Sequence, residues 1–302
     1  MRIEVVQAPL LDDRQRALLS MHSLLNILTV LKGELQLLRL SSGDEHAFAG
    51  SLGRIEMIRQ SLQDTEKTMY EIGRIDDTSD LLVDEISHFL DSLPEEADEA
   101  AINLSLDNVR STFSVLKIRS AEIVERSDDP YAWVKTDITR LKADFARVLL
   151  AMEKNSRGGY GIALNTSTSQ PDDYRISFEI VSPGDSEIFM PLVLRDVMRD
   201  LLANARKYSP PGSMISARLE NDGECLRFEV KDNGRGIPPG DMERVVAFGE
   251  RGNNVDDKPA MGGGFGLTKA AYVTKRLGGR FWIDSTLDKG TTVQLEIPRR
   301  VL

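Results

Sequence analysis

The hydrophobic periodicity of this chain changes part-way along, and this change constrains the fold more than any other feature. Up to about residue 156, apolar residues recur every three or four positions, which is typical of amphipathic helices. Beyond the segment NSRGGYG, stretches such as YRISFEIV and LRFEVKD alternate between apolar and polar residues, as strands do. The sequence therefore predicts an α+β protein whose C-terminal part is a layer of helices on a mixed sheet.

The N-terminal region predicts a helical hairpin. One helix spans about 10–41 and carries a leucine seam, and a second helical pattern follows the polar turn 41–46 and continues to about residue 72. The seam consists of Leu24, Leu28, Leu31, Leu35 and Leu38. One hairpin alone buries too little apolar surface to be stable. We therefore expect residues 1–76 to form a four-helix bundle in a homodimer.

His22 and Asn26 lie one helical turn apart, on another face of the first helix than the leucine seam. This spacing predicts an exposed polar stripe. Taken alone, it favours an ordinary surface histidine. The other two histidines, His46 in the turn and His88 further on, are expected to be solvated or packing residues.

The rest of the chain divides into two further regions. The polar segment RIDDTSD at 74–80 reads as a connector, and the mostly helical region 77–157 suggests no chemistry. Residues 158–302 form the predicted α/β domain, with helices at 190–207 and 266–277. Its expected strands are 174–181, 226–232, 279–286 and 291–298.

Composition excludes several function classes. The net charge of −10 argues against binding to a nucleic-acid backbone. Cys225 is the only cysteine, so an intrachain disulfide or a cysteine-based zinc site is excluded. No apolar run approaches 18 residues, and the first residues lack a signal-peptide pattern. We therefore expect no membrane segment and a cytoplasmic location.

Two segments of the C-terminal half could bind a nucleotide. In RDLLANARKYSPPGS, Asn204 and Lys207 lie three apart on a helix, where an amide oxygen can bind Mg²⁺ and a lysine can meet a phosphate. In KDNGRGIP, Asp232 ends a strand, and its carboxylate could accept a hydrogen bond from an exocyclic amine. Gly234 and Gly236 permit a tight turn beside it.

A third segment, MGGGFGLTKA, precedes a helix that starts near Leu267. Backbone N–H groups at a helix N-terminus bind anions, and glycines allow a ligand to approach closely. The context excludes a Rossmann fingerprint, and the P-loop pattern is absent.

In this order and spacing, the three segments resemble the N, G1 and G2 boxes of the Bergerat-fold ATPases, which include histidine kinases. The resemblance covers about 140 residues, from near 160 to the end. It implies an α/β sandwich that binds ATP and Mg²⁺ under a lid at about 238–261. FGERG at 248–252 resembles the F box of histidine kinases, which implies that Phe248 and Arg251 lie near the nucleotide.

The same resemblance implies roles for individual residues. Asn204 would bind Mg²⁺, Asp232 would bind the adenine amine, and Lys207 and Tyr208 would contact the phosphates and nucleoside. The glycines that would wrap the phosphates are Gly262, Gly264 and Gly266. One departure is Asp200, where these kinases more often carry an amide. Its carboxylate could still orient a metal-bound water or act as a base.

A hairpin with a histidine, followed by this ATPase region, resembles a histidine kinase of two-component systems. The pattern from His22 to Asn26 also resembles the helices of the sporulation phosphotransferase and of citrate-sensor kinases. The resemblance implies that His22 accepts the γ-phosphoryl group of ATP and passes it to a receiver aspartate of a response regulator. Asn26 could position water for dephosphorylation of that partner.

The main departure is Ser23, where most such kinases carry an acidic residue that orients the imidazole. Losing such a partner typically costs about 10²–10⁴-fold in rate. Asp64 or Glu66 could substitute. The alternative function is a phosphorelay phosphotransferase or a response-regulator phosphatase with weak kinase activity. An anti-sigma-type serine kinase shares the ATPase fold, but the N-terminal hairpin argues against it.

Overall fold

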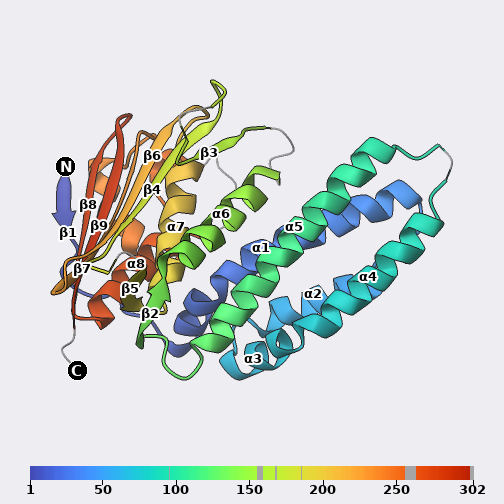
Figure 1. Ribbon diagram of the computed structural model, residues 1–302, viewed down its shortest axis with the longest axis horizontal. Helices are drawn as coiled ribbons and strands as arrows, with labels where there is room; N and C mark the ends of the chain where they lie inside the picture. Colours follow the sequence, from blue (N-terminus) through green and yellow to red (C-terminus); the bar gives the residue numbers. More distant parts are fainter. Residues whose placement is uncertain (95, 155–158, 167–168, 185, 256–262, 300–302) are drawn as a thin grey trace. The chain divides into compact units, whose positions relative to one another are not determined.

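The computed structural model describes residues 1–94, 96–154, 159–166, 169–184, 186–255 and 263–299. The chain forms two compact units (Figure 1). The helical unit contains Asp12–Ser127, and the sheet unit contains Met1–Leu11, Asp128–Glu153 and Gly158–Leu302. The chain therefore begins in the sheet unit, builds the helical unit and then returns.

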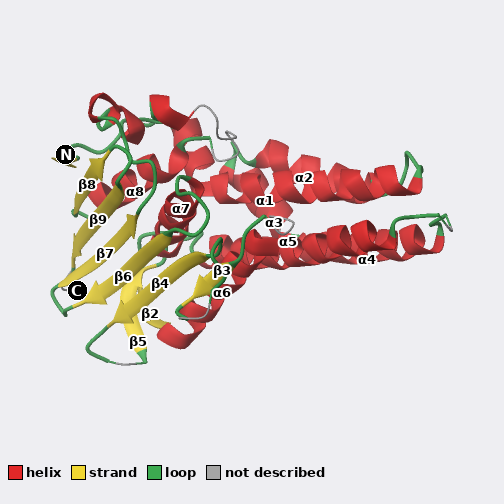
Figure 2. Ribbon diagram, turned by 90° about the horizontal axis from the view of Figure 1, so that it is seen from above, coloured by secondary structure: helices red, strands yellow, loops and turns green. Residues whose placement is uncertain are grey.

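The helical unit is a bundle made by a single chain. Its helices are α1 (Asp13–Ser42), α2 (Ala49–Ser61), α3 (Thr65–Gly73), α4 (Ile75–Asp91) and α5 (Glu99–Glu125). Within it, α1 packs along α5 and α2 packs on α4 (Figure 2). The predicted leucine seam of α1 is confirmed, because all five of its side chains are fully buried.

Polar contacts fix how these helices pair. Asn108 Nδ2 of α5 donates to Glu34 Oε1 of α1 at 3.2 Å, and Arg126 Nη2 donates to the Ser20 carbonyl oxygen at 3.1 Å. The earlier residue of α1 contacts the later residue of α5, so the two helices run antiparallel. A capping box between Asp12 and Gln15 starts α1.

Glu85 of α4 caps the start of α2. Its carboxylate accepts hydrogen bonds from the backbone N–H groups of Gly50 and Ser51 at 2.8 and 2.9 Å. Phe48, the N-cap residue of α2, makes no side-chain capping hydrogen bond, so a residue from another helix satisfies these donors.

The helical unit differs from the predicted hairpin in three ways. The second helical pattern is broken after Ser61, where Asp64 starts α3 as its N-cap. The expected connector 74–80 is helical, because α4 begins at Ile75. The predicted division at residue 77 therefore falls inside α4, and α4 and α5 share one apolar core with α1.

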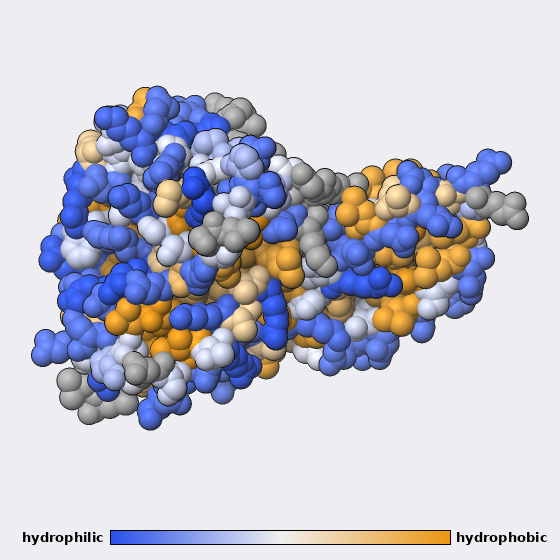
Figure 3. Space-filling model, turned by 45° about the horizontal axis from the view of Figure 1, so that its top comes forward, coloured by the Kyte–Doolittle hydropathy of each residue, from blue (hydrophilic) through white to orange (hydrophobic). Residues whose placement is uncertain are grey.

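This arrangement removes the physical reason for expecting a homodimer. The surface that one hairpin leaves uncovered is buried by α4 and α5 of the same chain. The bundle leaves some large apolar side chains exposed, and Figure 3 shows apolar surface over this unit. They include Leu37, Leu40, Met57, Val83, Leu90 and Leu104.

The sheet unit contains a seven-stranded sheet in the order β1-β8-β9-β7-β6-β4-β3. Its strands are β1 (Arg2–Glu4), β3 (Ile162–Leu164), β4 (Tyr174–Val181), β6 (Met214–Asn221), β7 (Cys225–Asp232), β8 (Arg280–Thr286) and β9 (Gly290–Pro298). Only the β3–β4 and β4–β6 pairs are parallel. The four predicted strands are all present.

Helices α6 (Ile138–Lys154), α7 (Leu194–Lys207) and α8 (Phe265–Arg276) belong to the same unit, together with a small sheet of β2 (Trp133–Asp137) and β5 (Glu187–Pro191). The helices predicted at 190–207 and 266–277 correspond to α7 and α8. Residues 128–153 pack here rather than with the other helices, so the predicted region 77–157 is shared between the two units.

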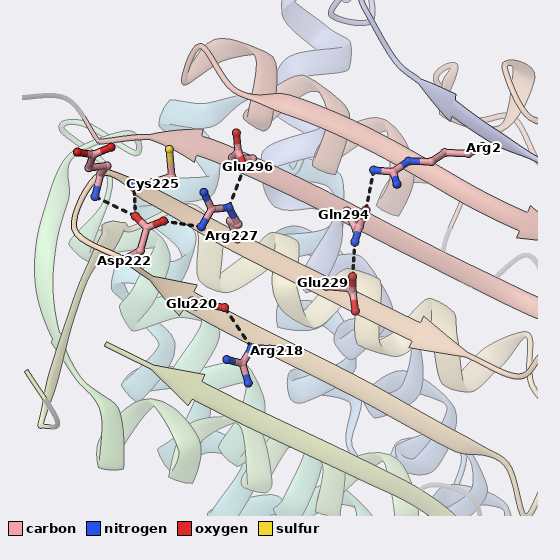
Figure 4. A network of polar contacts seen from close by, with 10 residues as sticks. Arg2, Arg218, Glu220, Asp222, Cys225, Arg227, Glu229, Gln294 and Glu296 are labelled. Atoms are coloured by element: carbon pink, nitrogen blue, oxygen red, sulfur yellow. Dashed lines mark hydrogen bonds and ion pairs between the residues drawn. The ribbon is translucent and has the colours of Figure 1, made fainter. Parts of the chain in front are cut away.

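The outer face of the sheet is polar. In Figure 4, Arg2 Nη2 donates to Gln294 Oε1 at 3.0 Å, and Gln294 donates in turn to Glu229. Arg227 Nε donates to Glu296 Oε2 at 2.8 Å on the same face. Such exposed pairs contribute at most about 1 kcal/mol each. The apolar core therefore lies on the other face, between the sheet and the helices.

Candidate nucleotide and phosphotransfer sites

The first element of the candidate nucleotide site is α7. Its apolar side packs into the core of the sheet unit, and Asn204 and Lys207 are half-buried near its end. Lys207 Nζ lies 5.4 Å from the centre of the Tyr208 ring. The carbonyl oxygen of Tyr208 accepts a hydrogen bond from the backbone N–H of Arg235 at 3.0 Å. The end of α7 is therefore joined to the loop that follows β7.

Asp232 is the last residue of β7, where it pairs with Ile215 of β6. Its Oδ1 accepts hydrogen bonds from the backbone N–H groups of Gly234 at 2.8 Å and Thr291 at 3.1 Å. Burial raises the pKa of this carboxyl to about 6, although both hydrogen bonds act to lower it. Among the described residues, both recorded bonds use Oδ1, which leaves Oδ2 as the acceptor for a ligand.

Close backbone contacts explain the glycines of this loop. A Cβ at Gly234 would lie 2.4 Å from the carbonyl oxygen of Tyr208 and 2.8 Å from Asp232 Oδ1. Gly236 has a φ of +66°, and a Cβ there would lie 2.2 Å from the carbonyl oxygen of Thr286. No side chain larger than hydrogen fits at either position without a shift of the loop.

The third element is the start of α8, which reaches Asn204. A Cβ at Gly266 would lie 2.5 Å from Asn204 Nδ2. Gly264, the N-cap of α8, has a φ of +74° and lies against the backbone of Gly249 and Glu250. The backbone N–H groups of the first turn of α8 therefore lie beside Asn204, an arrangement suited to phosphate. Gly262 lies outside the described residues.

The predicted F box lies against this third element. The rings of Phe248 and Phe265 are 4.7 Å apart, and Thr268 Oγ1 donates to the Ala247 carbonyl oxygen at 2.9 Å. Arg251 Nη2 donates to the Val255 carbonyl oxygen at 2.7 Å. Of the predicted lid, the described part forms three short 3₁₀ helices, Pro239–Asp241, Arg244–Val246 and Asn253–Val255. Positions 256–261 lie outside the described residues.

Sequence reasoning missed Asp241, which holds the described part of the lid together. It is buried and accepts hydrogen bonds from Arg244 Nη2 at 2.9 Å and from the backbone N–H of Asn253 at 2.7 Å. The turn signal PPGD ahead of an apolar stretch was the available clue.

His22 lies in the helical unit and is not exposed as predicted. Its side chain is 4% exposed, and the four consecutive residues from Met21 to Leu24 are all buried. The leucine seam identifies one buried face of α1, but it does not show how many neighbours surround the helix. In this part of α1, the side chains on every face of the helix are buried.

A backbone carbonyl lies beside the ring of His22. His22 Nδ1 lies 3.2 Å from the carbonyl oxygen of Leu19, one turn earlier. The Oγ of Ser23 and the Oδ1 of Asn26 are buried and have no hydrogen-bond partner among the described residues. Asp64, a suggested substitute acid, accepts from the backbone N–H of Lys67 as the cap of α3. Glu66, the other candidate, is exposed.

Comparison with known proteins identifies the C-terminal part of the chain. Residues 190–301 match the family described as histidine kinase-, DNA gyrase B-, and HSP90-like ATPase. Residues 190–301 therefore carry an ATPase domain of this family. The resemblance of this domain to that of two-component histidine kinases is thereby confirmed.

Curated relatives of the chain include sensor kinases. Sensor histidine kinase WalK of Bacillus subtilis (strain 168) is 34% identical over 107 residues, which is 35% of this chain and 18% of that protein. Aerobic respiration control sensor protein ArcB of Escherichia coli (strain K12) is 32% identical over 105 residues, 34% of this chain and 14% of that protein. The chain thus spans less than a fifth of these relatives.

Solved structures that match include a mycobacterial sensor histidine kinase, MprB, at 24% identity and a TM-score of 0.39, over 57% of this chain and 100% of that chain. Full-length ShkA in complex with AMPPNP matches at 19% identity and a TM-score of 0.39, over 71% of this chain and 39% of that chain.

The residues of the ATPase domain fit a nucleotide-borne Mg²⁺ rather than a metal held by the protein alone. Within the described parts of the chain, no group of three His, Cys, Asp or Glu side chains could hold a metal ion. Asn204 offers one amide oxygen, a hard ligand of the kind that Mg²⁺ prefers, so phosphate oxygens and water would complete the coordination.

Among the described helices of the structure, none is long and apolar enough to span a membrane.

Proposed function

We propose that this chain is an ATP-dependent protein histidine kinase that phosphorylates His22 and passes the phosphoryl group to a receiver aspartate of a response regulator. One observation carries the proposal. Asn204, Asp232 and Gly266 come from three separate elements, and close contacts between Tyr208 and Gly234 and between Asn204 and Gly266 join these elements inside the matched ATPase domain. We further propose a cytoplasmic location.

In this proposal each element handles one part of ATP. The Asp232 carboxylate accepts a hydrogen bond from the adenine amine, and Lys207 and Tyr208 contact the phosphates and nucleoside. Asn204 holds the Mg²⁺ that accompanies ATP, with Arg251 close to the nucleotide. The glycines of the phosphate loop, Gly262, Gly264 and Gly266, follow the phosphates with their backbone N–H groups. Mg²⁺-ATP supplies the phosphoryl group and neutralises charge during transfer.

The contact of His22 with Leu19 suggests which ring nitrogen reacts. A carbonyl oxygen can only accept, so the 3.2 Å contact is a hydrogen bond only when Nδ1 carries the proton. That tautomer leaves the lone pair on Nε2, which becomes the nucleophile. The Leu19 carbonyl group thus helps to orient the imidazole, as the acidic residue after the histidine does in most such kinases. This contact supports kinase activity despite Ser23.

The burial of His22 adds a requirement. With 4% of the side chain exposed, neither ATP nor a receiver domain can reach the imidazole in this conformation. We infer that phosphorylation follows a change that exposes this part of α1. Phosphoryl transfer would then be limited by the population of the open state as well as by chemistry.

A second function is favoured by one observation. Ser23 Oγ has no hydrogen-bond partner among the described residues, so it does not activate the imidazole of His22 in this structure. A phosphorelay phosphotransferase or a response-regulator phosphatase does not need rapid attack on ATP. In a phosphatase, the amide of Asn26 would position the water.

The decisive experiment uses γ-labelled ATP with Mg²⁺ and four proteins: wild type, His22→Ala, Asn204→Ala and His88→Ala. His88 is an exposed histidine in the same unit and is the matched control. We expect label that is stable to alkali and lost in acid, present in wild type and His88→Ala and absent from the other two. Label that survives His22→Ala would contradict the assignment. ATP binding without label would favour the phosphotransfer or phosphatase function.

A further inference from the structure

A cluster of charged side chains lies between α7 and α8 in the sheet unit, and three of its members, Asp196, Arg199 and Lys269, are buried. Lys269 of α8 is 2% exposed, and its Nζ lies 2.9 Å from Asp196 Oδ2 and 3.4 Å from Asp200 Oδ2. Arg199 Nη2 lies 3.0 Å from Asp196 Oδ1, and Asp196 is 1% exposed. Lys269, Arg199, Asp196 and the partly buried Asp200 thus belong to one charged cluster.

Burial of a charged lysine at this position is energetically unfavourable. Burying an ammonium group costs several kcal/mol before pairing, and an apolar side chain of similar size usually packs as stably. The neighbours of Lys269 on α8, Ala270 and Ala271, are fully buried and apolar. Stability alone therefore gives little reason for a lysine here.

On each helix, one member of the cluster lies about one turn from the phosphate end of the proposed ATP site. Lys269 follows Gly266 by three residues, and Asp200 precedes Asn204 by four. Four residues of α-helix advance about 6 Å. Gly266 and Asn204 are themselves in contact, so the cluster runs alongside that contact.

We propose that Lys269 is a specificity-determining residue for the nucleotide, because it offsets the negative charge of Asp196 and Asp200 where the triphosphate binds. This inference rests on the proposed ATP site. The carboxylate of Asp200, one turn from Asn204, would otherwise repel the phosphates of ATP, and Asp196 would add to this repulsion from one turn further away. Lys269 offsets the repulsion between these carboxylates and the phosphates. It therefore keeps the affinity for the triphosphate high relative to the affinity for the uncharged nucleoside.

The expected size follows from Coulomb's law. One unit of charge about 8 Å from a phosphate, in a partly buried site with an effective dielectric constant of about 20 to 30, changes affinity by about tenfold or somewhat more. Adenosine has no phosphate charge, so its affinity should not respond. The ratio of ATP affinity to adenosine affinity therefore isolates the effect from general damage to the fold.

The test measures both affinities on the full chain with Mg²⁺, by calorimetry for ATP and by competition for adenosine. Lys269→Met should lower the ATP-to-adenosine affinity ratio about tenfold. Lys269→Met combined with Asp200→Asn removes one charge of each sign and should restore the ratio to within about threefold. Lys275→Met, the same change six residues later on α8, should leave the ratio within about twofold.

The outcomes separate the inference from the proposed function. If wild type does not bind ATP, the proposed function fails. If wild type binds ATP but Lys269→Met lowers both affinities equally, the lysine is only structural and the inference is overturned. Should Lys269→Met not fold, Asp200→Asn alone decides: it removes a negative charge and should raise the ratio about tenfold, so an unchanged ratio would contradict the inference. A lowered ratio in that variant would contradict the inference.

Discussion

The single-chain bundle makes a sharp prediction about Leu116 of α5. This side chain is fully buried in the core shared by α1, α2, α4 and α5. Truncation to alanine removes its apolar contacts and leaves a cavity, which costs about 2–5 kcal/mol in such positions. We take about 3 kcal/mol as the expected loss in the free energy of opening of the helical unit.

Hydrogen exchange at the amides of α1 is the suitable assay. Both tryptophans, Trp133 and Trp282, lie in the sheet unit, so their fluorescence does not report on the bundle. A loss of about 3 kcal/mol lowers the protection of α1 amides by about 10²-fold, since about 1.4 kcal/mol corresponds to a factor of ten. Leu104→Ala is the control, because Leu104 lies on the same helix and is 43% exposed.

The result also tests whether one chain completes the bundle. A bundle made by one chain has protection in α1 that does not depend on protein concentration, whereas a dimer becomes more protected as concentration rises. Protection of α1 that is unaffected by Leu116→Ala, or that increases strongly with concentration, would refute the packing argument. Light scattering on the same samples gives the oligomeric state directly.

Three further predictions concern capping, pH and the glycine loop. Glu85→Ala should destabilise the helical unit by about 1 kcal/mol in denaturant unfolding, because it removes the cap of α2. The pKa of Asp232 is raised from 3.8 to about 6 in the folded state, so the folded protein holds this proton more tightly between these values. The free energy of unfolding of the sheet unit should therefore fall, by about 3 kcal/mol at most, as the pH rises from 4 to 6, and Asp232→Asn should flatten this slope. Gly234→Ala should reduce ATP affinity by about tenfold or more in calorimetry, because its Cβ would lie 2.4 Å from the Tyr208 carbonyl oxygen. Gly240→Ala, where a Cβ meets nothing within 4 Å, should bind like wild type.

Local patterns in the sequence predict the elements with regular periodicity. The leucine seam of α1 and the alternation in β4 and β7 each report a single element and its buried face. The sequence pattern predicts a connector where α4 begins, because the first turn of this helix, with Asp76 and Asp77, is polar. Acidic residues at that point are typical of a helix N-terminus as well as of a connector.

Hydrophobic periodicity does not predict contacts between distant segments of the chain. The exposure of His22 depends on how many neighbours surround α1, which the pattern of one helix does not reveal. Lys269 and Asp196 are 73 residues apart, and nothing local marks them as partners. The proximity of Gly266 to Asn204 was anticipated only through the family resemblance, because that resemblance carries three-dimensional information.

The pairing of β1 with β8 has a consequence for how the protein is made. Ile3 pairs with Ile283, so the first strand finds its partner only after the whole helical unit and residues 280–286 have been produced. Contacts within Asp12–Ser127 are available much earlier. Roughly 160 residues separate the end of that unit from the end of β8, which corresponds to about 8–30 s of translation. The helical unit can therefore fold on the ribosome while β1 is still an unpaired strand.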